Sequence, residues 1–279
     1  MDQPTDKDQD QDRDTDTYIH GHHESVLRSH RWRTVENSAS YLLPRLTPTT
    51  NLLDVGCGPG TITVGIASRV AGGRVVGIDT VEEILVEARA EAERQDCHNV
   101  SFEPGDVYRL AYRDASFDVV HAHQVLQHLV DPVAALREMR RVCRSGGTVA
   151  ARDGDYGAMF WYPANPLLED WMDLYHQVAA ANHVEADAGR HLPEWFRRAG
   201  FTDIDVSVGT YCYATREEQS WWGQMWADRA TKSTFATQAT ARGLATQDDL
   251  ETIASAWRDW STQPDGMFVV PNVEVLGRG

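Results

Sequence analysis

The sequence has little of what disulfide-rich, zinc-binding and membrane proteins need. Its four cysteines are far apart and form no C-x-x-C pair, so the spacing indicates neither a disulfide framework nor a thiolate zinc site. No stretch approaches the roughly 20 consecutive apolar residues of a membrane-spanning helix. The N-terminus also lacks the basic flank and apolar segment of a secretory signal. These absences predict a cytoplasmic protein with no membrane partner.

Basic residues are also scarce. The chain of 279 residues has 26 Lys and Arg against 42 Asp and Glu, a net charge of -16. A surface of this charge repels phosphate backbones, so nucleic acid is not an expected partner. Residues 1–17 contain seven aspartates and almost no apolar side chain, which predicts a disordered acidic tail. The remaining composition, with 42% hydrophobic and 24% charged residues, is typical of a globular protein.

Residues 18–46 are predicted to form an N-terminal helical lid. Within it, apolar side chains at roughly helical spacing predict a helix over Ser25–Leu43. Just before that helix come the histidines His20, His22 and His23. No nearby acid or cysteine completes a ligand set, so a metal site is not expected there.

From Asn51 onward, strands and helices alternate. Short apolar runs predict strands at Leu52–Val55, Arg74–Ile78, Val100–Glu103, Phe117–Ala122 and Thr148–Ala151. Helices are expected after Gly60, from Thr80 with a capping box to Glu83, over Gln124–Leu129, and from Asp131-Pro132. Repeated strand-helix units imply an α/β fold with a parallel sheet covered by helices on both faces.

The second half of the chain is less regular. We expect helices over Pro166–Asn182 and Leu192–Ala199 and strands over Asp203–Tyr213 and Met267–Leu276. Between these strands, two helical patterns begin at Thr215 and near Thr246. They predict a helical cap insertion at about 214–264 in a domain that spans 47–279.

The strongest motif is the glycine-rich loop in LLDVGCGPGT, residues 52–61. An apolar strand runs into three glycines and then a helix, as a backbone that turns sharply beneath a bulky ligand requires. The next strand ends in Asp79, a carboxylate that can accept both hydroxyl protons of a ribose. The spacing G-x-G-x-G-T differs from the dinucleotide pattern G-x-G-x-x-G, so the loop does not match the pattern that binds a pyrophosphate.

This segment resembles motif I of the class I S-adenosylmethionine-dependent methyltransferases, in particular the UbiE-like small-molecule branch. Pro104-Gly105-Asp106-Val107 and Phe117–His123 resemble the motifs at the third and fourth strands. Arg144-Ser145-Gly146-Gly147-Thr148 resembles the turn before the fifth strand, with Ser145 where proline is usual. The resemblance covers roughly Asn51 to Asp153.

The resemblance implies a Rossmann-like sheet of order 3-2-1-4-5-7-6 with strand seven antiparallel. It implies S-adenosyl-L-methionine as cofactor, with Asp79 on the ribose and Asp106 on the adenine amino group. Tyr18 and one histidine of the lid would cover it. The expected cofactor-binding residues are Tyr18, Asp54, Gly56, Cys57, Gly58, Asp79, Thr80, Gly105, Asp106, Val107, His121, His123 and Gln124.

Methyl transfer is an in-line displacement in which the protein mainly aligns donor and acceptor, adding a base where the acceptor is a hydroxyl or a protonated amine. The candidate catalytic residues are His123, Asp153, Asp155 and Tyr156. Two carboxylates beside Tyr156 could hold a cationic amine or accept a proton; the alternative is a solvated acidic loop. For His128, a structural role at a helix end is favoured.

Aromatic residues are dense beyond Phe160. They form either a core or an aromatic substrate wall, and they are Trp161, Tyr162, Trp171, Tyr175, Trp195, Trp221, Trp222 and Trp226.

The sequence thus predicts a methyltransferase of small-molecule or secondary metabolism. N- or O-methylation of a polar, amine- or sugar-bearing acceptor is favoured over C-methylation of a quinone-like ring. A non-catalytic S-adenosylmethionine-binding module is a second alternative, and an NAD-dependent oxidoreductase is the least favoured. The sequence does not indicate an oligomeric state.

Overall fold

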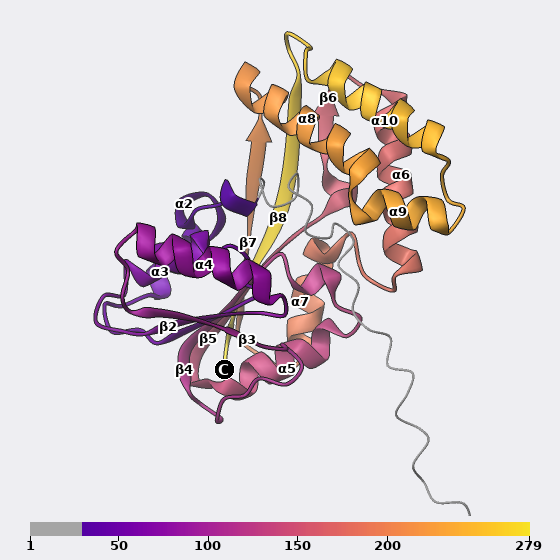
Figure 1. The fold of residues 1–279 in the computed structure, drawn as a ribbon. Coiled ribbons are helices and arrows are strands. Elements are labelled where there is room, and N and C mark those ends of the chain that lie inside the picture. Colours follow the sequence, from indigo (N-terminus) through magenta and orange to yellow (C-terminus); the bar gives the residue numbers. More distant parts are fainter. Residues whose placement is uncertain (1–29) are drawn as a thin grey trace, which may run out of the picture.

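The sheet of the computed structural model, which describes residues 30–279, has five parallel strands at its centre (Figure 1). They lie in the order β3-β2-β1-β4-β5, with bounds β1 Leu52–Val55, β2 Val75–Asp79, β3 Val100–Pro104, β4 Phe117–His123 and β5 Cys143–Gly154. The long strand β8 (Met267–Arg278) pairs antiparallel with β5, and β7 (Ile204–Tyr213) pairs antiparallel with β8. The predicted sheet order and the antiparallel strand are confirmed.

One strand was not predicted. β6 (Phe160–Tyr162) pairs with the first residues of β8, beyond the point where β5 ends. With only three residues, β6 is too short for an alternating pattern to reveal it.

Apolar side chains on both faces of the sheet explain why the parallel strands read as continuous hydrophobic runs. In β1, Leu53 and Val55 pack in one buried cluster, and Leu52 packs in another on the opposite face. The first cluster is covered by α5 (Pro132–Val142) and α7 (Ala188–Arg198). The opposite face is covered by α3 (Thr61–Ala67), α4 (Glu82–Arg94) and α2 (Val35–Ser38).

Helix starts follow side-chain caps in some places and not in others. Asp131 caps α5, since its Oδ1 accepts a hydrogen bond from the backbone N–H of Ala134 at 2.9 Å. The capping box predicted at Thr80 is wrong: α4 begins at Glu82, and Asp79 instead accepts the N–H of Val81 at 3.1 Å. The predicted helix Gln124–Leu129 is a single 3-10 turn, η2 (Leu126–His128), which leads at once into the Asp131 cap.

The predicted helix Ser25–Leu43 is wrong over its described part. The helical conformation is interrupted at Thr34. The side chain of Thr34 accepts a hydrogen bond from the N–H of Asn37 and caps the start of the short helix α2. A 3-10 helix, η1 (Ser40–Arg45), follows and contains Pro44, which has no N–H to continue a hydrogen-bonded helix. The predicted acidic tail and the residues Tyr18, His20, His22 and His23 lie outside the described residues.

Four helices gather around the first half of β8, at the top of Figure 1. They are α6 (Pro166–Ala181), α8 (Arg216–Lys232), α9 (Thr234–Ala241) and α10 (Gln247–Trp260). Helices α8 and α10 begin after Thr215 and Thr246, as the sequence predicts, and the structure shows a capping box at each start. Helix α9 was missed, because Ser233 makes no side-chain cap and its small residues carry little amphipathic pattern.

The core of this bundle is aromatic. Trp171, Trp226, Trp257 and Trp260 are almost completely buried in one cluster with Phe268 of β8. That cluster is separate from those that cover the parallel strands. None of the helices within residues 30–279 has the length and hydrophobicity to span a bilayer.

Candidate active site

A cavity of about 410 Å³ opens at the carboxyl ends of the parallel strands. Most of its lining residues fall into two sets. The first, which we call the loop wall, comprises lining residues of the glycine-rich loop and of the ends of β2 and β3: Asp54, Val55, Gly56, Cys57, Gly58, Pro59, Thr61, Ile62, Asp79, Thr80, Val81, Ile84, Gly105, Asp106 and Val107. The second, the aromatic wall, comprises Tyr156, Met159, Tyr211, Tyr213, Trp222, Trp226 and Arg229.

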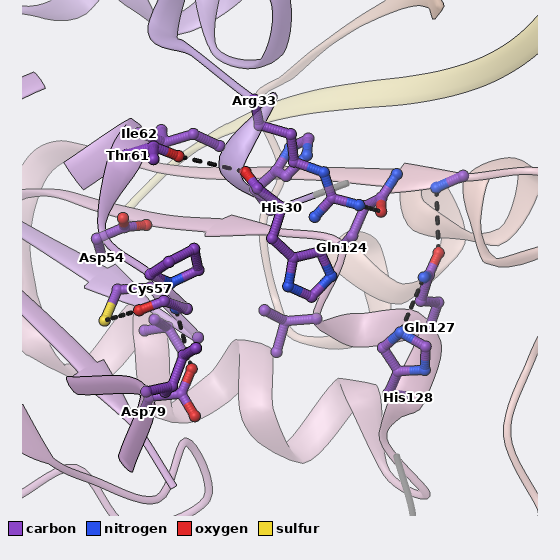
Figure 2. A pocket seen from close by; sticks show the side chains of 18 of the residues that line it. His30, Arg33, Asp54, Cys57, Thr61, Ile62, Asp79, Gln124, Gln127 and His128 are labelled. Carbon is purple, nitrogen blue, oxygen red and sulfur yellow. Dashed lines mark hydrogen bonds between the residues drawn. The ribbon is translucent and has the colours of Figure 1, made fainter. Parts of the chain in front are cut away.

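Other lining residues belong to neither wall. Figure 2 shows Asp54, Cys57 and Asp79 on one side of the pocket and Gln127 and His128 on the other, with His30 and Arg33 between them.

The glycine-rich loop has a backbone conformation that favours glycine over residues with a side chain. Gly56 has φ +65°, and a Cβ there would lie 2.4 Å from Val125 Cγ2. Gly58 has φ +52°, but a Cβ there would meet only His30 Nδ1 at 4.0 Å, because the loop faces the cavity at this point. The N–H of Gly58 donates to Asp79 Oδ2 at 3.0 Å, which ties the loop to the end of β2.

Asp54 is held by two buried partners. Its Oδ1 lies 2.7 Å from His121 Nδ1, and its Oδ2 accepts the hydroxyl of Thr63 at 2.5 Å. His121 itself is fully buried and does not line the cavity, so the expectation that it binds the cofactor is not met. The register of the sheet explains this: Asp54 and His121 are paired residues on neighbouring strands, with side chains on the same face.

The other expected cofactor residues within 30–279 all line the cavity: Asp54, Gly56, Cys57, Gly58, Asp79, Thr80, Gly105, Asp106, Val107, His123 and Gln124. They come from the ends of four strands, which the fold brings to one edge of the sheet. Asp106 accepts the N–H of Tyr108 through Oδ1 at 2.8 Å.

Of the four expected catalytic residues, His123 and Tyr156 line the cavity and the two aspartates do not. Asp155 forms an ion pair with Arg190. The Nε of Arg190 donates to Oδ2 at 2.8 Å, and its Nη2 donates to Oδ1 at 2.5 Å. Asp153 is buried beneath η2, where its Oδ1 accepts the N–H of Gln127 at 3.2 Å. Burial raises the pKa of Asp153 to about 8. The structure therefore does not bring these two carboxyls to the lining of the cavity.

His123 is a neutral imidazole in the wall of the cavity. Burial, with Arg33 next in importance, holds its pKa well below the usual value. Its Nε2 lies 3.4 Å from the hydroxyl of Tyr211, and its Nδ1 has no hydrogen-bond partner. Tyr156 stacks flat on Tyr175 with ring centroids 4.0 Å apart, and burial raises its pKa, so it serves as wall rather than as base.

A buried polar network stands behind Tyr211. Arg152 donates to the Tyr211 hydroxyl at 2.5 Å, and Ser38 shares a hydrogen bond with the same oxygen at 2.7 Å. Arg152 also pairs with Glu274, with 3.2 Å between Nε and Oε1. The network fixes the hydroxyl next to His123 and joins the N-terminal segment to β5, β7 and β8.

Several lining residues were not expected from the sequence. Arg33 donates to Gln124 Oε1, and Gln124 in turn donates to Asn272 at 3.0 Å. His128, expected to be structural, lines the cavity, and burial lowers its pKa to about 3. Of these unexpected lining residues, only Arg229 could have been found from the sequence. It follows Trp222 and Trp226 at the i, i+4, i+7 spacing of one helical face.

The aromatic residues divide between the two roles considered. Trp171, Trp257 and Trp260 are core, whereas Trp222 and Trp226 pack in the same cluster and also line the cavity. Trp222 stacks on Tyr213 with centroids 4.0 Å apart, and Trp32 meets Tyr211 edge-on at 5.3 Å.

Comparison with known proteins identifies the family. Residues 46–200 match the family model described as a methyltransferase domain. An uncharacterized methyltransferase of Schizosaccharomyces pombe is 32% identical over 99% of this chain and 98% of its own length. The probable methyltransferase ltbC of Aspergillus luteorubrus is 28% identical, covering 93% of this chain and 96% of that protein. The ubiquinone/menaquinone biosynthesis C-methyltransferase UbiE of Bdellovibrio bacteriovorus is 38% identical over 57% of this chain and 69% of that protein.

Solved structures share the fold. A phosphoethanolamine N-methyltransferase of Haemonchus contortus, solved with S-adenosylhomocysteine, superposes over 94% of this chain and 61% of its own with a TM-score of 0.56 and 15% identity. The YcgJ protein of Bacillus subtilis gives the same TM-score over 87% of this chain and 98% of its own, at 17% identity. The chain belongs to the methyltransferase domain family and is a class I methyltransferase whose cofactor is S-adenosylmethionine.

Proposed function

We propose that this enzyme methylates a planar aromatic small molecule that binds against the aromatic wall. The observation that carries the proposal is the lining itself: Tyr156, Tyr211, Tyr213, Trp222 and Trp226 line one cavity together with the loop wall. Flat apolar rings with a few placed polar groups are what an aromatic ligand needs.

The residues of the loop wall fit S-adenosylmethionine. Asp79 would accept the ribose hydroxyls, because its carboxylate lines the cavity at the end of β2, where the N–H groups of Gly58 and Val81 fix its orientation. Asp106 would accept the adenine amino group through Oδ2, and the open space above Gly58 leaves room for the ligand. When bound, the cofactor supplies a methyl group on a positively charged sulfur.

His123 is the residue we propose at the reacting end of the acceptor. His123 lines the cavity, and its buried Nδ1 has no hydrogen-bond partner within residues 30–279. Tyr211 holds the ring through Nε2. A neutral imidazole can accept a hydrogen bond from an acceptor hydroxyl and orient it. As a hydroxyl oxygen gains a methyl group its proton becomes strongly acidic, so even a base of low pKa can take it.

An amine acceptor is no longer favoured. The expectation of an amine rested on Asp153 and Asp155, and neither lines the cavity. C-methylation of an aromatic ring is the second candidate, because a relative named as a ubiquinone/menaquinone C-methyltransferase and two named as demethylmenaquinone methyltransferases match this chain over about half its length. Both O- and C-methylation suit a planar ring.

The test is transfer of labelled methyl from S-adenosylmethionine to a small-molecule extract, followed by mass spectrometry. We expect label on an aromatic metabolite, and His123→Phe should lower its rate by about a hundredfold. His98→Phe is the matched control, because His98 is exposed and lies outside the cavity. Label on an aliphatic amine would contradict the proposal, and binding of the cofactor without any transfer would favour the non-catalytic module.

A further inference from the structure

Charges of opposite sign are segregated in the cavity. Its lining carboxylates are Asp54, Asp79 and Asp106, and all three belong to the loop wall. Its lining arginines are Arg33 and Arg229. Among the described residues the aromatic wall contributes an arginine and no carboxylate to the cavity. A ligand on that side meets positive charge.

Arg229 is built into the aromatic wall. It lies on the same face of α8 as Trp222 and Trp226, is only 5% exposed, and has its guanidinium carbon 5.0 Å from the centre of the Trp226 ring. A guanidinium stays protonated at every physiological pH. Stacking on an aromatic ring also fixes the plane in which its N–H groups point.

Arg33 brings a second guanidinium from the N-terminal segment. Its side chain donates a hydrogen bond to the neutral amide of Gln124, and no carboxylate within residues 30–279 forms an ion pair with it. Burial raises the pKa of Tyr156, and the charges of Arg229 and Arg33 both oppose that rise. Both arginines line the same cavity as Tyr156.

The neighbouring histidines do not supply that positive charge. Burial and Arg33 hold the pKa of His123 well below its usual value, and the same two causes lower that of His128 to about 3. At neutral pH the fixed positive charges among the described lining residues are therefore those of Arg33 and Arg229. Arginine binds a carboxylate through two parallel hydrogen bonds, which gives orientation as well as affinity.

Building on the proposed function, we propose that the methyl acceptor is an aromatic carboxylate whose negative group binds to Arg229, in the cavity that Arg33 also lines. The ring lies against Trp222 and Trp226, and the position to be methylated is turned toward His123. Arg229 thereby selects acids over neutral rings of the same shape.

The test uses two probes of matched shape, 2-naphthoate and the neutral 2-naphthamide. Binding to the full chain saturated with S-adenosylhomocysteine is measured by calorimetry and by quenching of tryptophan fluorescence. We expect 2-naphthoate to bind at least about tenfold more tightly, and Arg229→Gln to remove this preference. Arg229→Lys keeps the charge without the two-pronged geometry and should retain part of it. Arg216→Gln, at an exposed position of the same helix, should retain all of it.

The outcomes separate the two proposals. If S-adenosylhomocysteine binds and both probes bind equally, or if Arg229→Gln leaves the preference intact, the carboxylate proposal is overturned and the aromatic acceptor stands. If neither probe binds to the cofactor complex, the aromatic acceptor is overturned as well. Should Arg229→Gln fail to fold, high salt on the unaltered enzyme replaces it: 2-naphthoate must lose affinity while 2-naphthamide does not.

Discussion

The two walls of the cavity are formed by different kinds of residue. The loop wall is built from backbone in glycine conformations and from short carboxylates at strand ends, and its shape is set within a few residues of each strand. The aromatic wall is built from long side chains of α8, β7 and the turn after β5, and its shape depends on how a separate bundle packs on β8. One wall suits a ligand common to a family, and the other can be re-formed for a different acceptor without altering the first.

A substitution in the loop wall alone is the most direct test of this difference between the walls. Asp79→Ala removes the carboxylate proposed to bind ribose, and the loss of charged hydrogen bonds should weaken S-adenosylhomocysteine by about a hundredfold. Calorimetry measures this affinity. Asp265→Ala is the control, because Asp265 is exposed and does not line the cavity. An unchanged affinity in Asp79→Ala would show that the loop wall does not hold the cofactor.

Damage to the aromatic wall should have the opposite selectivity. Trp222→Ala removes a ring that lines the cavity and stacks on Tyr213, so we expect the KM of the acceptor to rise by about tenfold and cofactor affinity to stay within about twofold.

Trp222→Ala also costs stability, roughly 3 kcal/mol for a buried tryptophan. Trp257→Ala is therefore the matched control, since Trp257 is buried in the same cluster but does not line the cavity. It should lose similar stability and keep the acceptor KM. If both variants raise KM alike, loosening of the bundle is the cause and the two walls are not independent.

Asp153 tests a carboxyl that belongs to neither wall. Burial raises its pKa from 3.8 to about 8, so over this range the folded chain keeps a proton that the unfolded chain has released. Stability attributable to this group is therefore present below about pH 4 and is lost as the pH rises toward 8. Between pH 6 and pH 8 the loss should be about 2 kcal/mol.

Asp153→Asn cannot ionise, so its stability should fall less over the same pH range. Urea unfolding of both proteins at pH 6 and pH 8 measures the difference. Parallel losses in the two proteins would mean that Asp153 is already ionised at pH 6.

The smallest effect on activity is expected at Asp155. Its carboxylate is paired with Arg190 outside the cavity, so Asp155→Asn should leave kcat within about twofold. The lost ion pair should cost about 1 to 2 kcal/mol in unfolding measurements. A large fall in kcat with unchanged stability would return Asp155 to the active site.

The loop wall could be predicted from the sequence because its signals are local. The glycines, the acid ending β2 and the acid after β3 each lie next to the strand that positions them, and parallel strands bring their ends together. His121 was misplaced because it lies one strand away from Asp54, and only the register between the strands shows that the two side chains meet.

The aromatic wall could not be predicted in the same way. Tyr211 of this wall and Arg33, which lies outside it, reach the cavity from segments far apart in the chain, and nothing near either residue indicates a ligand. Asp155 looked available because Arg190, its partner, lies in another helix. For the same reason, the expected amine acceptor rested on carboxylates whose tertiary partners the sequence does not reveal.

Strand β8 joins the two substructures of the protein. Its last residues pair with β5 in the parallel sheet, and its first residues pair with β6 beside the tryptophan bundle. In the order of synthesis β8 follows every strand it pairs with, so β5 and β7 leave the ribosome with edges that have no partner yet. Pairings as distant as Thr148 with Arg278 form slowly, because a long loop must close first. Until β8 is added, a nascent chain can hold a formed glycine-rich loop but neither a finished sheet nor a finished aromatic wall.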